Sequence, residues 1–268
     1  MRLRLLLLGS LIALSACGSS SADNASSNAS QCPDESTKGP LVVLAASSMA
    51  SVFTDTEQRF LTDHPCVTNV SFSYGSSATL AAQIVNGSPA DVFVSASEKT
   101  MNTVVDNNRT VNATLFGRNS GEIMANVSSR FVSEITSISS LSDSFNPGIK
   151  VGLCVATAPC GALADTILEK AGISRTAIAD TESPSVEDLV SKIEMGELDA
   201  GIVFHSDCVS ALIQKSSQCV SVPSDMNAST SYYVAALNSR SVSQQFADFV
   251  SSPSFTGTLQ SKFGFLAP

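Results

Sequence analysis

Residues 41–95 read LVVLAASSMASVFTDTEQRFLTDHPCVTNVSFSYGSSATLAAQIVNGSPADVFVS. The run Leu41–Ala46 is short and apolar, which predicts a buried strand. Apolar residues then recur at helical spacing between Met49 and Phe60, and Pro65 predicts the end of that helix. The pattern continues with a strand at Val67–Tyr74, a helical face over residues 80–85, a strand at Val92–Val94 and a further helical face over residues 101–105.

Strands that alternate with helices in this way predict a parallel sheet with right-handed crossovers. Residues 119–149 are less regular and hold one clear strand candidate, Glu122–Val127. Alternation then resumes, so we expect two α/β units separated by an irregular crossover. The later elements are expected as strands at Ile149–Val155, Ala200–Phe204, Cys219–Val222 and Tyr232–Leu237, and as helices at Gly161–Lys170, Val186–Met195, Val242–Ser251 and Phe255–Phe263.

The composition excludes two classes of protein. The 268 residues carry 15 Lys and Arg against 24 Asp and Glu, a formal net charge of −9. Removing Arg2 and Arg4 with a leader peptide would take this charge from −9 to −11. Because a nucleic-acid-binding protein needs a basic surface for the phosphate backbone, we expect no nucleic-acid partner. Apolar residues make up 43% of the chain, enough for a core, which excludes global disorder.

The N-terminus reads MRLRLLLLGSLIALSAC over residues 1–17. Two arginines precede an apolar run too short to span a bilayer as a stable helix, which is typical of a signal peptide. Leu14-Ser15-Ala16-Cys17 resembles a bacterial lipobox, with an ordinary secretory signal and a chance cysteine as the alternative. The resemblance predicts a signal peptide at 1–16, a lipid on Cys17, a serine-rich tether at 17–38, and an anchor on the extracytoplasmic face of a bacterial cell membrane.

Export permits disulfides, and six cysteines remain after Cys17. Their proximity along the chain favours Cys154–Cys160 and Cys208–Cys219, which leaves Cys32–Cys66 as the third pair. A metal site is the rival interpretation, but the sequence has no CxxC pair and neither histidine stands at a CxxH spacing. We therefore expect three disulfides.

Enzyme signatures are missing from the sequence. It contains no GxSxG elbow, HExxH helix, GxxxxGK[ST] loop or GxGxxG turn. His205-Ser206-Asp207 holds the residue types of a catalytic triad, but adjacent residues on an extended chain point apart. We therefore expect a protein that is not an enzyme.

Three turns join the end of a predicted strand to the start of a predicted helix and carry small or hydroxyl-bearing residues. Small residues let a ligand approach the backbone, and the first N–H groups of a helix lack partners and attract anions. Each serine alone is more simply an N-cap. Together the three turns predict a ligand site, because open α/β sheets bind ligands at the carboxyl ends of their strands. They are Ala45-Ala46-Ser47-Ser48, Gly75-Ser76-Ser77-Ala78-Thr79 and Pro159-Cys160-Gly161-Ala162.

These turns and the segments around them resemble the solute-binding proteins of molybdate ABC importers. The resemblance covers about residues 40–268 and rests on an ordered set of motifs, none of which is decisive alone. The motifs are Val43–Met49 (VLAASSM), Tyr74–Ile84 (YGSSATLAAQI), Gly87–Ser97 (GSPADVFVSAS), Ala158–Gly161 (APCG), Gly196–Asp207 (GELDAGIVFHSD) and Thr258–Phe265 (TLQSKFGF).

The resemblance implies an α/β, two-lobed periplasmic-binding-protein fold of type II. Each lobe would be a mostly parallel sheet flanked by helices, and the lobes would close on the ligand in the cleft by a hinge. Residues 39–118 with 238–268 are expected to form lobe I, and residues 119–237 lobe II. The implied function is that of a monomer that captures molybdate or tungstate, uses no cofactor, and delivers the oxyanion to an ABC permease.

The resemblance also implies the binding residues. In the family two serines bind the oxyanion through hydroxyl and backbone N–H groups, and these positions fall on Ser47 and Ser77. Further backbone N–H donors fall on Cys160 and Val186. Neutral donors in a dry cleft can hold a dianion such as molybdate without a counter-charge, which would explain anion binding by an acidic protein.

One position departs from the family pattern. The family's second-lobe strand ends in a tyrosine whose hydroxyl reaches the oxyanion, and the matching residue is Phe204, which has no donor. Either a donor is missing, or Thr157, Ser48 or Ser206 supplies it.

Three alternatives stay open at this point, one of which is an envelope adhesion or structural protein, supported only by the serine-rich tether. The same fold would also suit another small oxyanion, such as sulfate or phosphate, and pocket size would separate these from molybdate. A surface hydrolase that uses Ser47 or Ser77 is the alternative from a different class. It would need a histidine beside either serine, and the sequence places neither His64 nor His205 there.

Overall fold

The structure is a computed structural model that describes residue 32, residues 34–110 and residues 112–268. Residues 34–268 form one compact unit, to which all elements named below belong. The predicted signal peptide, Cys17 and most of the predicted tether lie outside the described residues. In the part of the chain that is described, no helix has the length and apolar character of a membrane span.

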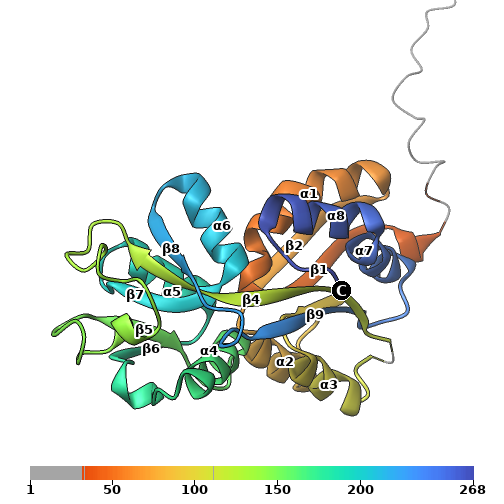
Figure 1. Cartoon of the computed structure of the whole chain (residues 1–268). Helices are drawn as coiled ribbons and strands as arrows, with labels where there is room; N and C mark the ends of the chain where they lie inside the picture. The colour runs from red at the N-terminus through yellow and green to blue at the C-terminus, as the bar shows by residue number, and fades with distance from the viewer. Residues whose placement is uncertain (1–31, 33, 111) are drawn as a thin grey trace, which may run out of the picture. The chain divides into compact units, whose positions relative to one another are not determined.

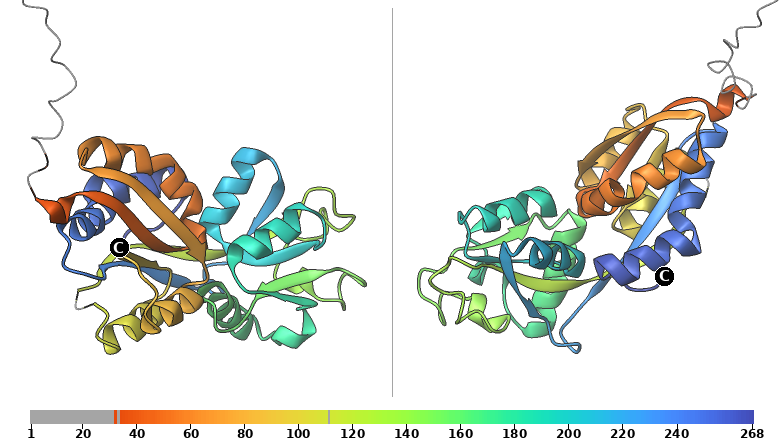
Figure 2. Two further views of the ribbon diagram at one scale, coloured as in Figure 1. Left: turned by 180° about the vertical axis from the view of Figure 1, so that it is seen from behind. Right: turned by 90° about the horizontal axis from the view of Figure 1, so that it is seen from above.

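The first half of the unit follows the predicted alternation of strands and helices. Strand β1 (Gly39–Ala46) pairs in parallel with β2 (Val67–Gly75) on one side and with β3 (Val92–Ser95) on the other. The last four residues of β1 are buried, as expected for an apolar strand between two neighbours. Helices α1 (Ala50–Asp63), α7 (Ser241–Ser251) and α8 (Pro253–Phe263) cover one face of this sheet, and α2 (Ser77–Val85) and α3 (Glu98–Asp106) cover the other (Figures 1 and 2).

The second half is also built from parallel strands that alternate with helices. Strand β5 (Val151–Cys154) lies between β6 (Thr181–Ser183) and β7 (Ala200–Phe204) and pairs with both in parallel. Strand β8 (Ser217–Ser221) is antiparallel to β4. The helices of this half are α4 (Pro159–Ala171), α5 (Val186–Glu194) and α6 (His205–Gln214), and the 3-10 turns of the unit are η2 (Glu35–Thr37), η3 (Ser47–Met49), η4 (Ser139–Leu141) and η5 (Arg175–Ala177).

Two long strands connect the halves. Strand β4 (Thr114–Asn126) pairs with β9 (Ser229–Ala236) as far as Ser120, and from Gly121 onward it pairs with β7 and β8. Strand β9 also pairs with β3. Figure 1 shows β4 and β9 side by side between the two groups of elements. The strand order is therefore continuous across the unit, from β2 through β1, β3, β9, β4, β7 and β5 to β6.

The predicted fold class is confirmed: the unit is mixed α/β, with an open sheet flanked by helices and parallel strands in each half. The division into lobes at the stated residues stays a prediction. Among the strands and α-helices of the described residues, three features were not predicted. They are the first part of β4, the short strand β6, and helix α6, where we expected an extended chain at His205-Ser206-Asp207.

Two of the predicted disulfides are present. Cys154–Cys160 and Cys208–Cys219 are bonded, with Cα–Cα distances of 5.7 and 5.9 Å. Cys32 and Cys66 are disulfide-bonded as well, and their pairing with each other stays a prediction. The Cys154–Cys160 bond ties the end of β5 to the first turn of α4, and the Cys208–Cys219 bond ties α6 to β8.

Candidate functional site

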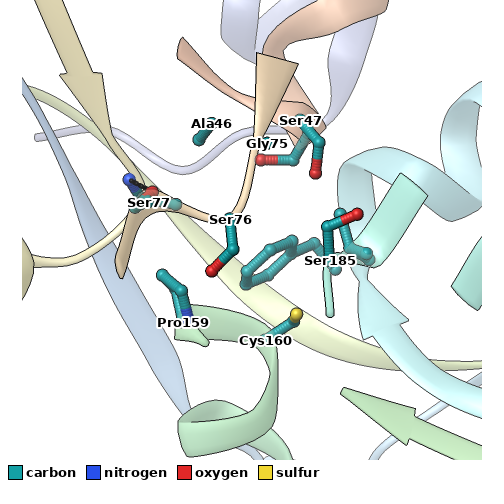
Figure 3. A pocket seen from close by; sticks show the side chains of 12 residues that line it. Ala46, Ser47, Gly75, Ser76, Ser77, Pro159, Cys160 and Ser185 are labelled. Carbon is teal, nitrogen blue, oxygen red and sulfur yellow. Dashed lines mark hydrogen bonds between the residues drawn. The ribbon is translucent and has the colours of Figure 1, made fainter. Parts of the chain in front are cut away.

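Five helical segments begin around one small pocket. They are η3 with α1 directly behind it, and the helices α2, α4, α5 and α6. The pocket is small, with a volume of about 10 Å³, so it suits a small ion better than a drug-sized ligand. Its lining comes from both halves of the unit. The twelve lining residues are Ala46, Ser47, Ser48, Gly75, Ser76, Ser77, Ala96, Pro159, Cys160, Ser185, Val186 and Phe204 (Figure 3).

All five residues predicted for the ligand site line this pocket. Ser47 and Ser77 come from the first half, and Cys160, Val186 and Phe204 come from the second. Their side chains are nearly inaccessible, since none of these residues is more than 7% exposed. The structure therefore brings the predicted set together, while the atoms through which each residue would hold a ligand stay a prediction.

Two of the pocket serines have hydroxyl oxygens that accept a hydrogen bond from the protein. Ser77 Oγ accepts from the backbone N–H of Ala96 at 3.0 Å, the bond drawn in Figure 3. Ser185 Oγ accepts from the backbone N–H of Asp188 at 3.3 Å and so caps α5. A hydroxyl carries one hydrogen, and in both serines the oxygen is engaged as acceptor. Each O–H is therefore available to donate to a group in the pocket.

Backbone donors come from the second half. In α4 the first intrahelical bond runs from Ala162 N to Ala158 O, and in α5 it runs from Leu189 N to Ser185 O. The N–H groups of Cys160 and Val186 precede these bonds and have no carbonyl one turn earlier. They add to the positive end of each helix dipole, so an anion in the pocket would be favoured.

The pocket itself is uncharged. None of its twelve lining residues, all of them described, is an Asp, Glu, Lys, Arg or His. Any attraction that the lining itself has for an anion therefore comes from N–H and O–H dipoles. Such dipoles are fixed by the fold and are stronger in a site from which water is excluded.

Phe204 ends strand β7 and stands at the N-cap position of α6. Of the three hydroxyls considered as replacements for the absent tyrosine, only that of Ser48 belongs to a residue that lines the pocket. Thr157 lines a larger neighbouring cavity, and Ser206 Oγ accepts from Asn119 Nδ2 at 2.7 Å. The structure thus favours Ser48.

Sequence reasoning missed two of the pocket serines as site residues, Ser76 and Ser185. Ser185 carried a usable signal, because a serine followed three residues later by Asp188 matches the pattern of a helix N-terminus. Ser76 is the N-cap residue of α2, although its side chain makes no capping hydrogen bond. Its neighbour Ser77 is the first residue of α2 rather than its cap.

His205 belongs to a pair outside the pocket. Its Nδ1 atom lies 2.5 Å from Glu122 Oε2, and Glu122 Oε1 accepts from Ser221 Oγ at 2.8 Å. His205 begins α6 and does not line the pocket, so it supplies no base to Ser47 or Ser77. The hydrogen bond with Glu122 raises the pKa of His205, against the effect of burial. Burial alone would raise the pKa of Glu122, but its bonds to His205 and Ser221 lower it.

These shifts predict a pH-dependent contribution of His205 to stability. Because the folded pKa of His205 lies above its ordinary 6.5, the pair stabilises the fold fully below that value and loses its effect as the pH rises through the raised pKa. Because the pKa of Glu122 is lowered, its carboxylate stays charged over the whole pH range in which His205 loses its proton. Since His205 is partly exposed, solvent screening limits the effect to about 1 kcal/mol or less.

The measurement is thermal unfolding of the parent and of His205→Gln between about pH 6 and pH 9. Glutamine keeps a hydrogen-bond donor but cannot be charged. We expect the parent's advantage in unfolding temperature to be largest at the acid end and to shrink toward the alkaline end. His64→Gln, a histidine outside this pair, is the control. An advantage that stays constant across the range would contradict the charge argument.

The unit has two halves that share long strands, and helices from both halves begin at one pocket. None of the twelve lining residues is an acid or a base. This arrangement defines a protein that binds a small solute. The chain belongs to the bacterial extracellular solute-binding protein family, whose model matches residues 41–266. Members of this family are solute-binding proteins and not enzymes, so the hydrolase alternative is dropped.

Three of the similar proteins are described as molybdate-binding proteins. The chain is 32% identical over 247 residues to the molybdate-binding protein ModA of Mycobacterium tuberculosis strain H37Rv, with 88% of this chain and 87% of that protein covered. It is 29% identical over 227 residues to the molybdate-binding protein ModA of Escherichia coli K12, with 81% and 85% covered. The solved periplasmic molybdate-binding protein of Azotobacter vinelandii matches the fold with a TM-score of 0.73 at 19% identity, covering 85% of this chain and 99% of that one.

Proposed function

We propose that this protein captures molybdate, or the near-isosteric tungstate, outside the cytoplasm and delivers it to an ABC permease. The observation that carries the proposal is the convergence of five helix starts on a small pocket without a charged lining residue. A tetrahedral dianion presents four acceptor oxygens and no donor. Such a ligand matches a site built from serine O–H groups and backbone N–H groups.

The similar proteins support the choice of oxyanion. The relatives from Mycobacterium tuberculosis and Escherichia coli are both molybdate-binding proteins, and each matches more than four fifths of this chain. Ser47, Ser77, Cys160 and Val186 are the residues we propose as donors to the oxyanion. Phe204 would pack against it without a hydrogen bond, and no cofactor takes part.

The remaining features of the proposal concern location and partners. Family membership places the protein outside the cytoplasm. We propose that it is held at the cell membrane by a lipid on Cys17, after removal of residues 1–16, and that residues up to 38 act as a tether. We further propose that it works as a monomer with a membrane-embedded permease. The lipobox-like sequence Leu14-Ser15-Ala16-Cys17 supports the anchor.

Calorimetric titration of the purified mature protein tests the proposed ligand. We expect saturable one-to-one binding of molybdate and of tungstate, with sulfate and phosphate weaker by at least about ten-fold. Sulfate is smaller because S–O bonds are shorter than Mo–O bonds, so it would leave some donors out of reach. Tighter binding of sulfate or phosphate than of molybdate would assign the pocket to that oxyanion, and the proposal would fail.

A further inference from the structure

A buried tyrosine lies behind the pocket and contacts one of its serines. Tyr232 on β9 is fully buried, and its hydroxyl oxygen lies 2.7 Å from Ser48 Oγ. The ring of Phe204 packs edge-on against the Tyr232 ring, with 6.0 Å between centroids. Ser48 lines the pocket, whereas Tyr232 does not. The Tyr232 hydroxyl can therefore affect a ligand only through Ser48.

The Asn119 carboxamide lies near this hydrogen bond. The Asn119 Oδ1 atom accepts from the backbone N–H of Ser120 at 3.1 Å and from that of Ser206 at 3.4 Å. These two bonds fix the orientation of the carboxamide, so its NH₂ group faces the other way, toward groups that can accept. One of its hydrogens goes to Ser206 Oγ at 2.7 Å.

Asn119 also lies close enough to the Tyr232 hydroxyl to influence its pKa. Burial raises the pKa of Tyr232, with the nearby Asp207 acting in the same sense, while the interactions of its hydroxyl with Ser48 and Asn119 oppose it. The phenol is therefore neutral and keeps its proton. Ser48 Oγ lies within hydrogen-bond distance of this buried hydroxyl, and a buried O–H without an acceptor is costly, so the phenol O–H donates to Ser48 Oγ. In the described part of the chain, Ser48 Oγ has no other hydrogen-bond partner, so its own O–H is free for the pocket.

We propose that Tyr232 is a positioning residue that makes Ser48 a hydrogen-bond donor to the bound oxyanion. Ser48 then takes the place of the hydroxyl that Phe204 lacks. This inference rests on the proposed function, because it needs an oxyanion in the pocket.

The same arrangement sets the class of anion. Ser48, Ser77 and Ser185 each have an oxygen already engaged as acceptor, so each presents its hydrogen to the pocket. A pocket of donors favours an oxyanion that carries no proton at neutral pH, such as molybdate or sulfate. Hydrogen phosphate must donate its own proton and would meet donors only, which is a mismatch.

The first test is a double-mutant cycle on the mature protein, with calorimetric titration of sodium molybdate. We expect Ser48→Ala to raise the molybdate Kd by about ten-fold or more and Tyr232→Phe by about three- to ten-fold. If Tyr232 acts through Ser48, adding Tyr232→Phe to Ser48→Ala should bring no further loss. Tyr233→Phe, the neighbouring phenol outside the pocket, should bind like the parent.

The second readout is selectivity. In Tyr232→Phe the Ser48 hydroxyl can turn and accept, so the affinity for phosphate relative to molybdate should rise by about three-fold or more. A tyrosine with a merely structural role would weaken molybdate binding equally with and without Ser48 and would leave this ratio unchanged. Either of those results overturns the inference.

The test allows for a variant that does not fold, and two further outcomes separate this inference from the function on which it rests. If Tyr232→Phe does not fold, Ser48→Ala still decides, since a folded Ser48→Ala protein with the parental molybdate Kd overturns the inference. If the parent itself binds neither molybdate nor tungstate, the proposed function fails and the inference falls with it. If the parent binds molybdate and the cycle shows no coupling, only the inference is lost.

Discussion

Ser77→Ala is expected to weaken molybdate binding by about ten- to hundred-fold, because it removes one charge-assisted hydrogen bond, which contributes roughly 1.5–3 kcal/mol. Ser47→Ala should have an effect of the same size for the same reason. Ser77→Ala should also lower the free energy of unfolding by about 1–3 kcal/mol, since the buried N–H of Ala96 loses its acceptor. Calorimetric titration measures the first effect and thermal unfolding the second.

The two effects are separated with a matched serine. Ser97 caps α3 by accepting a hydrogen bond from Thr100 N, and it is not among the residues that line the pocket described above. Ser97→Ala should therefore cost about 1 kcal/mol of stability and leave the molybdate Kd unchanged. If folded Ser47→Ala and Ser77→Ala proteins both bound molybdate as tightly as the parent, the pocket described above would not be the binding site.

Gly161→Ala is expected to have the largest effect on stability among single-methyl changes in the pocket region. A Cβ at this position would lie 2.0 Å from Val155 O and 2.8 Å from Cys154 O, and both are backbone atoms. The loop cannot easily yield, because the Cys154–Cys160 disulfide closes it and Val155 N is bonded to Ser183 O. We expect a loss of about 3 kcal/mol or more in the free energy of unfolding, measured by denaturant titration.

The same substitution should weaken molybdate binding, because the first turn of α4 would have to move away from the pocket. Gly257→Ala in α8 is the matched control, since a Cβ there meets no atom within 4 Å. It should leave binding unchanged and raise stability by about 0.4–1 kcal/mol. Equal stability of Gly161→Ala and Gly257→Ala would mean that the loop relaxes freely, contrary to the steric argument.

The parts of the fold that were predicted correctly are those with a strong local pattern. The run that becomes β1 and the helical spacing that becomes α1 each depend on residues a few positions apart. The first part of β4 has no such pattern, because its residues 114–120 are held by β9, which is more than a hundred residues away in the sequence. Helix α6 was missed although Asp207, in its first turn, accepts from Phe204 N and signals a helix start.

The residues of the candidate site also fall into those that the sequence could predict and those that it could not. Ser47, Ser77, Cys160 and Val186 could be named from the sequence because each stands near a predicted helix start at a position that the resemblance to the family marks. The contact of Ser48 with Tyr232 could not be named, because 184 residues separate the two along the chain. Which of the available hydroxyls faces the pocket depends on how β9 lies behind η3, and local sequence carries no signal for that.

The uncharged lining of the pocket has an electrical consequence. The twelve lining residues include no Asp, Glu, Lys, Arg or His that could take up a proton when an anion binds, so a protein that holds the proposed dianion would be more negative than the empty one by the full charge of the ligand. The added field originates in a pocket that both halves of the unit line and extends to the surface around it. A membrane partner could therefore distinguish the ligand-bound from the ligand-free protein by electrostatic potential. The same difference in charge should make the ligand-bound protein migrate faster toward the anode.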